Sequence, residues 1–162
     1  SKSFAMTGWR LGYIGAPEWI AKACTKIQGQ FTSGASSISQ RAALDAVSYS
    51  PKVILPMKEA FLERRNFMLK ELRNIKGIKI NEPKGAFYLF PDVSELFGQH
   101  FDGKTINNAD DLCLFLLEEA KVALVTGNAF GSPNCIRISY AASMEQLKEA
   151  VYRIKSAISQ LN

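Results

Sequence analysis

A lysine and an arginine stand eight positions apart in the stretch SKSFAMTGWRLGY, which opens the sequence. The amine of Lys2 could act as a nucleophile if burial or a neighbouring cation lowered its pKa. The stretch offers both, because Phe4 and Trp9 are apolar and Arg10 is cationic. The guanidinium of Arg10 is also well suited to bind a phosphate. Taken alone, Lys2 is equally compatible with an ordinary solvated surface charge.

A second arginine that could bind an anion lies in the segment CIRISYA. Residues 135–140 of this segment alternate in a way that predicts a β-strand, with Arg137 near its middle. A guanidinium can bind a substrate carboxylate through two parallel hydrogen bonds, but it can also form a structural ion pair. Phe87, in the segment GAFY, could contact a substrate or pack in the core. Residue type alone leaves both choices open.

Helices and short strands must position these residues. Hydrophobic periodicity predicts helices over residues 18–28 and 38–49, and a long helix from Ser50-Pro51 to about residue 75. Two further helices begin at an Asn108 N-cap and at a Ser143–Gln146 capping box. Strands are expected at residues 11–16, 78–80, 86–90, 122–125 and 135–140. This order predicts a mixed α/β protein with a boundary near residue 50, and residues 98–103 are expected to form a surface loop around His100.

Composition excludes several classes of function. The 162 residues are 47% hydrophobic and 22% charged, and no apolar run is long enough to cross a membrane. The net charge of +5 comes from Lys and Arg interleaved with Glu, a pattern typical of solvated helix faces rather than nucleic-acid binding. Three scattered cysteines and one histidine fit neither a zinc site nor a disulfide framework. We therefore expect a cytoplasmic protein with no metal, nucleic-acid or membrane partner.

Four segments, in order, resemble motifs of the class I pyridoxal-phosphate (PLP) aminotransferases. The stretch SK…MTGWR…GY resembles the lysine motif of this family, in the variant found in its aspartate aminotransferase branch. The segment GAFY at 85–88 resembles its glycine-aromatic strand, and residues 135–141 resemble the strand that holds its substrate-binding arginine. Residues 122–131 resemble the segment VAVxPGxxFG, although Thr126 replaces the usual proline. The turn at Thr126 is therefore expected to differ from the family's.

The resemblance implies the α/β fold type I of PLP-dependent transferases. Residues 1–50 would be the last part of the large PLP-binding domain, and residues 51–162 the small C-terminal domain with its long linking helix. The sequence is expected to be the C-terminal piece of a homodimeric enzyme. Such a piece would lack the upstream cofactor-binding residues and would not transaminate alone.

The resemblance also implies roles for individual residues. Lys2 would form a Schiff base with PLP and move a proton between the substrate α-carbon and the cofactor, and Arg10 would bind the cofactor phosphate. Arg137 would bind the substrate carboxylate, and Phe87 would lie beside the substrate. The expected reaction moves an amino group between aspartate and 2-oxoglutarate. Alternatives are another class I substrate specificity, a ligand-sensing domain of a transcriptional regulator, and a non-catalytic piece.

Overall fold

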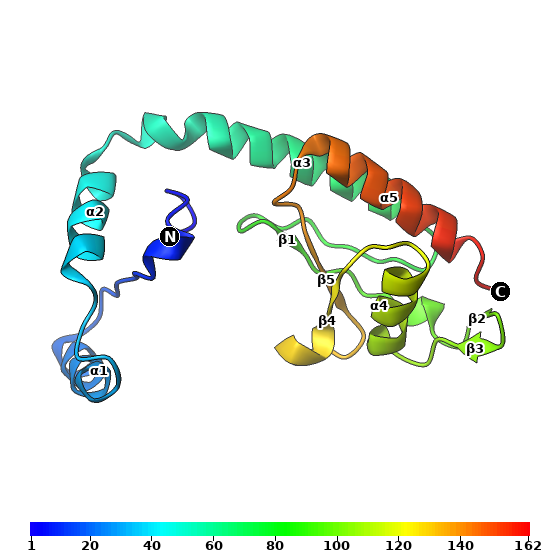
Figure 1. Ribbon diagram of the computed structural model, residues 1–162, viewed down its shortest axis with the longest axis horizontal. Helices are drawn as coiled ribbons and strands as arrows, with labels where there is room; N and C mark the ends of the chain where they lie inside the picture. Colours follow the sequence, from blue (N-terminus) through cyan, green and yellow to red (C-terminus); the bar gives the residue numbers. More distant parts are fainter. The chain divides into compact units, whose positions relative to one another are not determined.

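The computed structural model describes residues 1–162, which form two compact units, Ser1–Met57 and Lys58–Asn162 (Figure 1). Helix α3, Leu55–Arg73, begins in the first unit and continues through the second. The sequence-based boundary at residue 50 falls at the 3₁₀ helix η2, Pro51–Ile54, just ahead of α3. None of the helices is both long and apolar enough to span a bilayer.

The first unit is built from short helices. It contains the 3₁₀ helix η1 (Thr7–Trp9) and the α-helices α1 (Glu18–Phe31) and α2 (Ser37–Ser48). The predicted helices at 18–28 and 38–49 are thus confirmed, but the strand predicted at 11–16 is wrong. That segment has no regular secondary structure and is almost entirely exposed. The reason is that no strand of this unit is available to pair with it.

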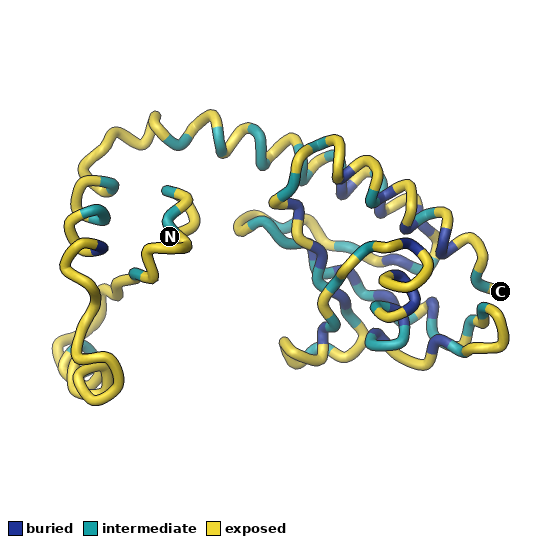
Figure 2. The backbone as a smooth tube through the Cα atoms, in the orientation of Figure 1, coloured by how far each residue is buried: buried dark blue, intermediate teal, exposed yellow.

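The first unit has no apolar core. Ser39 is its one buried residue (Figure 2), whereas large apolar side chains lie on its surface. The most exposed are Tyr13 at 90%, Phe31 at 82%, Trp19 at 74% and Ile38 at 72%. Apolar patches of this kind mark surfaces that other polypeptide covers. This unit therefore depends on further protein for its stability.

The second unit contains a three-stranded antiparallel sheet in the order β1-β5-β4. Its central strand is β5 (Ile136–Ser139), flanked by β1 (Tyr88–Leu89) and β4 (Val125–Thr126). The strands predicted at 86–90 and 135–140 are present but shorter than expected, whereas the one predicted at 122–125 is displaced, because β4 begins only at Val125. The strand predicted at 78–80 is reduced to a single bridge between Lys79 and Asp92. The short strands leave β5 as the element that holds the sheet together.

Three helices enclose the core of the second unit: α3, α4 (Ala109–Glu118) and α5 (Met144–Ile158). Helices α3 and α5 lie side by side (Figure 1) and are joined by an ion pair between Glu71 and Lys155. Both predicted helix starts are confirmed. The Asn108 side chain accepts a hydrogen bond from the Asp111 N–H at 2.9 Å, and Ser143 with Gln146 forms a capping box. All the buried hydrophobic residues of the chain belong to this unit.

A small hairpin replaces the surface loop expected around His100. Strands β2 (His100–Phe101) and β3 (Lys104–Thr105) pair across the turn Asp102-Gly103. Both turn residues have positive φ, 46° and 74°, as a type I′ turn requires. An Asp-Gly pair is among the strongest short-range signals for such a turn, so the sequence could have predicted this hairpin.

Gly127 lies where two backbone segments approach each other closely. A Cβ atom at this position would overlap the carbonyl oxygens of Ser132 and Cys135 and lie 2.9 Å from the Cys135 carbonyl carbon. We expect Gly127→Ala to lower the free energy of unfolding by about 1–3 kcal/mol, because backbone must shift to accept the methyl group. Gly85→Ala is the control, since no atom lies within 4 Å of its Cβ position. Equal denaturant midpoints for the two variants would contradict this packing.

Asp92 gives the second unit a pH-dependent contribution to stability. Its carboxylate accepts hydrogen bonds from the hydroxyl and the backbone N–H of Ser94, at 2.6 and 2.9 Å, at the start of the 3₁₀ helix η3 (Ser94–Leu96). These bonds lower the pKa of Asp92. A lowered pKa in the folded state stabilises the fold above the ordinary value and ceases to do so as pH falls through the folded value.

We therefore expect the free energy of unfolding to decline as pH falls below about 4. The decline should be smaller in Asp92→Asn, because that variant has no carboxylate to protonate. Urea titrations at a series of pH values measure both curves. Parallel curves for the two proteins would show that Asp92 contributes nothing to the pH dependence.

Candidate functional site

The loop that carries Lys2 is closed onto its own end by hydrogen bonds. The Ser1 hydroxyl donates to the Leu11 carbonyl at 2.8 Å, and the Met6 N–H donates to the Ser1 carbonyl at 2.7 Å. The Lys2 carbonyl accepts from the Ala5 N–H at 3.1 Å. Lys2 is exposed in this chain. Its backbone is thus fixed inside a compact turn.

Arg10 ends the same loop in a left-handed conformation, with φ 52° and ψ 47°. One of its amino groups donates to the Thr7 carbonyl at 3.1 Å, and it forms no ion pair within the chain. The Trp9 carbonyl just before it accepts a hydrogen bond from the Ser39 hydroxyl at 2.8 Å. The one buried side chain of the first unit therefore anchors this loop to α2. Most guanidinium donors of Arg10 remain available for an anion.

Arg137 is the corresponding cation of the second unit. Along β5 the side chains alternate, so that Ile136 and Ile138 are buried in the core and Arg137 lies on the other face. Its guanidinium carbon lies 4.6 Å from the centre of the Tyr88 ring and 4.5 Å from the centre of the Phe130 ring. No carboxylate of the chain forms an ion pair with it. The half-buried cation is therefore packed against aromatic rings and is not neutralised.

Strand register explains why Tyr88 lies beside Arg137. Tyr88 on β1 is opposite Ser139 on β5, and Arg137 comes two residues before Ser139 on the same face. Residues in this diagonal relation are within reach of an aromatic side chain. The register of one strand pair thus determines the contact.

Phe130 comes from the 3₁₀ helix η4 (Gly127–Phe130), which directly follows β4. The Thr126 hydroxyl caps η4 by accepting the Asn128 N–H at 3.3 Å. The Asn128 side chain in turn donates to Asp110 in the first turn of α4 at 2.5 Å. Thr126 stands where the family motif has proline, and its side chain caps the start of η4.

Phe87 belongs partly to the core. Its ring stacks on Phe61 of α3 at 5.9 Å and lies 4.5 Å from the ring of Tyr88. The Tyr140 N–H donates to the Phe87 carbonyl and the Tyr140 hydroxyl to the Ala86 carbonyl, both at 3.0 Å. Burial of Tyr140 raises the pKa of its hydroxyl, so it remains a donor at neutral pH. A substrate contact of Phe87 stays a prediction.

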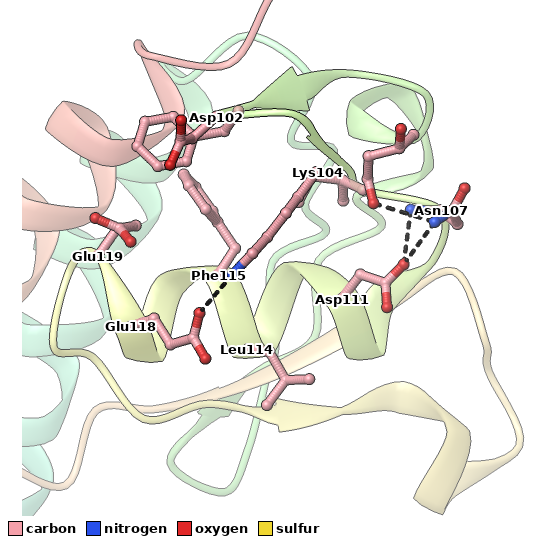
Figure 3. Close-up of a pocket in the computed structure, with 11 residues that line it drawn as sticks. Asp102, Lys104, Asn107, Asp111, Leu114, Phe115, Glu118 and Glu119 are labelled. Carbon is pink, nitrogen blue, oxygen red and sulfur yellow. Dashed lines mark hydrogen bonds and ion pairs between the residues drawn. The ribbon is translucent and has the colours of Figure 1, made fainter.

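A separate pocket of about 280 Å³ lies between the β2–β3 hairpin and α4 (Figure 3). Its only amine, that of Lys104, lies 3.5 Å from Glu118 (Figure 3). Four carboxylates line it, those of Asp102, Asp111, Glu118 and Glu119. An acidic lining repels phosphates and carboxylates. This pocket therefore contains none of the residues predicted to bind an anion, since Arg10 lies on the loop at 1–10 and Arg137 on β5.

The predicted site residues fall into two groups. Lys2 and Arg10 share one loop of the first unit, whereas Arg137 lies on β5 of the second unit and Phe87 directly precedes the neighbouring strand β1. Sequence reasoning missed the two rings over Arg137 and the anchoring role of Ser39. The two-residue alternation of the strands could have indicated Tyr88, but nothing in the sequence indicates that Ser39 reaches Trp9.

Comparison with known proteins decides the family. The profile of the family "Aminotransferase class I and II" matches residues 1–154. The chain belongs to this family. Class I aminotransferases use PLP, and their structures have fold type I of the PLP-dependent enzymes, which is the fold class expected from the sequence.

Individual aminotransferases resemble the chain over nearly all of its length. A bifunctional aspartate aminotransferase and glutamate/aspartate-prephenate aminotransferase of Petunia hybrida is 54% identical over 98% of this chain and 34% of its own. An aspartate aminotransferase of Pinus pinaster is 48% identical over 98% of this chain and 33% of its own. The crystal structure of the aspartate aminotransferase from Rhizobium meliloti superposes with a TM-score of 0.90, at 42% identity, covering 99% of this chain and 40% of that one. The chain thus spans about a third of the two plant relatives.

The residues of the first unit fit the cofactor of this family. PLP carries an aldehyde, with which the amine of Lys2 could react, and a phosphate, to which the spare donors of the Arg10 guanidinium could bind. The hydrogen bonds around the loop fix both backbones before anything binds. An amine and a guanidinium are the two groups needed to hold an aldehyde that also carries a phosphate.

The anchoring role of Ser39 can be tested by amide hydrogen exchange in the full-length protein. Ser39→Ala removes the donor to the Trp9 carbonyl, so amides of residues 6–11 should exchange roughly fivefold faster, the factor for about 1 kcal/mol. Ser48→Ala is the matched control, because its exposed hydroxyl donates within α2 to Leu44. Unchanged exchange at residues 6–11 in Ser39→Ala would contradict the anchor.

Proposed function

We propose that the full-length protein is an aspartate aminotransferase that moves an amino group between aspartate and 2-oxoglutarate with PLP held by Lys2. The observation that carries this proposal is the half-buried guanidinium of Arg137, which has no counter-charge in the chain. Both proposed substrates are dicarboxylates, whose carboxylates can supply that charge. The names of the plant relatives support aspartate as the amino donor.

Within this proposal, the first unit holds the cofactor. The Lys2 amine would bond its aldehyde carbon, and the Arg10 guanidinium would bind its phosphate through paired hydrogen bonds. When bound, PLP supplies an electron sink that makes the α-hydrogen of an amino acid acidic. Once the amine of the substrate has displaced it from the aldehyde carbon, the freed amine of Lys2 would move the proton at the substrate α-carbon, which is general acid–base catalysis by a positioned side chain.

The second unit orients the substrate. The planar fork of Arg137 would donate two parallel hydrogen bonds to the substrate carboxylate, which fix the direction of the α-carbon. Phe87, half-buried beside Tyr88, would form an apolar wall next to it. Apolar surroundings exclude water and strengthen the ion pair of Arg137 with its ligand.

We assign residues 1–50 to the end of the large cofactor domain and residues 51–162 to the small domain. The lack of an apolar core in the first unit supports this division, because a larger domain would cover its exposed side chains. We propose that part of this cover is a second subunit of a homodimer. Alone, the chain is expected to be inactive. The relatives described above are aminotransferases, so a regulatory domain is not favoured.

One comparison suggests a second oxo acid that could accept the amino group. The name of the petunia relative includes glutamate/aspartate-prephenate aminotransferase. Prephenate also carries two carboxylates, so the same arginine chemistry would suit it. Steady-state rates with aspartate and either 2-oxoglutarate or prephenate distinguish the two oxo acids.

The role of Lys2 can be tested by chemical labelling. Full-length protein is incubated with PLP, reduced with borohydride and digested, and the pyridoxyl group is located by mass spectrometry. We expect the label on Lys2, and its loss in Lys2→Ala together with a fall in aspartate transamination of about 10²- to 10⁴-fold.

Lys22→Ala is the matched control, because Lys22 is an exposed lysine paired with Glu18 on α1. It should retain both label and activity. A label on another lysine of the folded wild-type protein, with Lys2 unmodified, would overturn the proposed function.

A further inference from the structure

The surroundings of Arg137 are unusual for a half-buried cation. Such a group is ordinarily stabilised by an acidic partner. Here the guanidinium carbon instead lies 4.6 Å from the centre of the Tyr88 ring and 4.5 Å from the centre of the Phe130 ring. Both distances are well within the limit of about 6 Å for a cation–π interaction.

We propose that Tyr88 and Phe130 form an aromatic clamp that positions Arg137 for the substrate carboxylate. This inference rests on the proposed function, in which Arg137 binds that carboxylate. Neither ring needs to touch the reacting atoms. Both are therefore positioning residues that act through Arg137.

A ring face stabilises the cation without using its N–H donors. An Asp or Glu in the same place would occupy the fork of the guanidinium and compete with the substrate. The aromatic clamp avoids this competition, because the π-electrons of the rings attract the positive charge while the N–H donors of the guanidinium stay available. The chain thus holds a cation ready for a carboxylate and supplies no carboxylate of its own.

The second unit builds the clamp from its own residues. Phe130 meets the ring of Phe90 edge-to-face, with centres 6.0 Å apart and planes at 87°. The hydrogen bond from Asn128 to Asp110 ties η4 to α4, and the β1–β5 register sets Tyr88. Neither ring depends on a bound ligand for its place. Such a prearranged site loses little freedom when the carboxylate binds.

The test measures the dissociation constant of succinate, a plain dicarboxylate, for the full-length holoenzyme by calorimetry. Phe130→Leu removes the ring face and keeps an apolar side chain at a position that is 48% exposed. We expect succinate to bind about five- to tenfold more weakly, because an Arg137 side chain no longer held by the ring must be ordered when the carboxylate binds, at a cost of about 1–1.4 kcal/mol. Phe130→Tyr, which keeps a ring, should restore binding to within about twofold.

Two further variants complete the design. Tyr88→Leu removes the other ring and should weaken binding in the same direction. Phe101→Leu is the matched control, because it breaks a comparable ring pair, with Phe115 at 5.2 Å, that does not involve Arg137. It should leave the dissociation constant unchanged.

Failure of the aromatic clamp and failure of the proposed function give different results. The clamp is overturned if Arg137→Met abolishes succinate binding while Phe130→Leu and Tyr88→Leu bind it as the wild type does. It is also overturned if Phe130→Tyr or Phe101→Leu weakens binding as much as Phe130→Leu. The proposed function fails instead if the wild-type holoenzyme binds succinate but does not transaminate aspartate.

Discussion

The arrangement of the sheet in the second unit centres on a positive charge that has no carboxylate partner in the chain. Arg137 lies on the central strand of the sheet, so its position depends on both flanking strands and on the turn that follows β4. Each of these parts has a physical reason: the β1–β5 register sets Tyr88, and the close backbone approach at Gly127 sets η4. The apolar core beneath the sheet holds all of them in place. The second unit thereby holds this guanidinium against two aromatic rings without an ion pair from the chain.

In the first unit, local hydrogen bonds shape the structure and apolar burial contributes little. It places Lys2 and Arg10 in one hydrogen-bonded loop, but it buries no apolar side chain. Local hydrogen bonds can shape a loop, whereas hydrophobic burial supplies most of the stability of a domain. The shape of the loop is therefore encoded locally, whereas the unit lacks the apolar core that would stabilise it alone.

Local sequence signals predicted much of the fold. The caps at Asn108 and Ser143 and the helices at 18–28 and 38–49 follow from periodicity and side-chain hydrogen bonding, which need only neighbours in sequence. The strand expected at 11–16 failed because a strand needs a partner that periodicity does not reveal. The family and the four site residues were predicted from motifs, and the placement of the four in a catalytic site remains a proposal. The rings over Arg137 depend on strand register and on a turn some 40 residues from Tyr88, which only the folded chain brings together.

We propose that the guanidinium of Arg137 binds a carboxylate of the substrate. Nuclear magnetic resonance of the full-length holoenzyme with isotope-labelled arginine tests it directly, with the Arg137 side-chain signal assigned by its loss in Arg137→Lys. Titration with succinate should shift this side-chain N–H signal and saturate with the dissociation constant found by calorimetry. A signal that stays unchanged while succinate binds elsewhere would contradict the account.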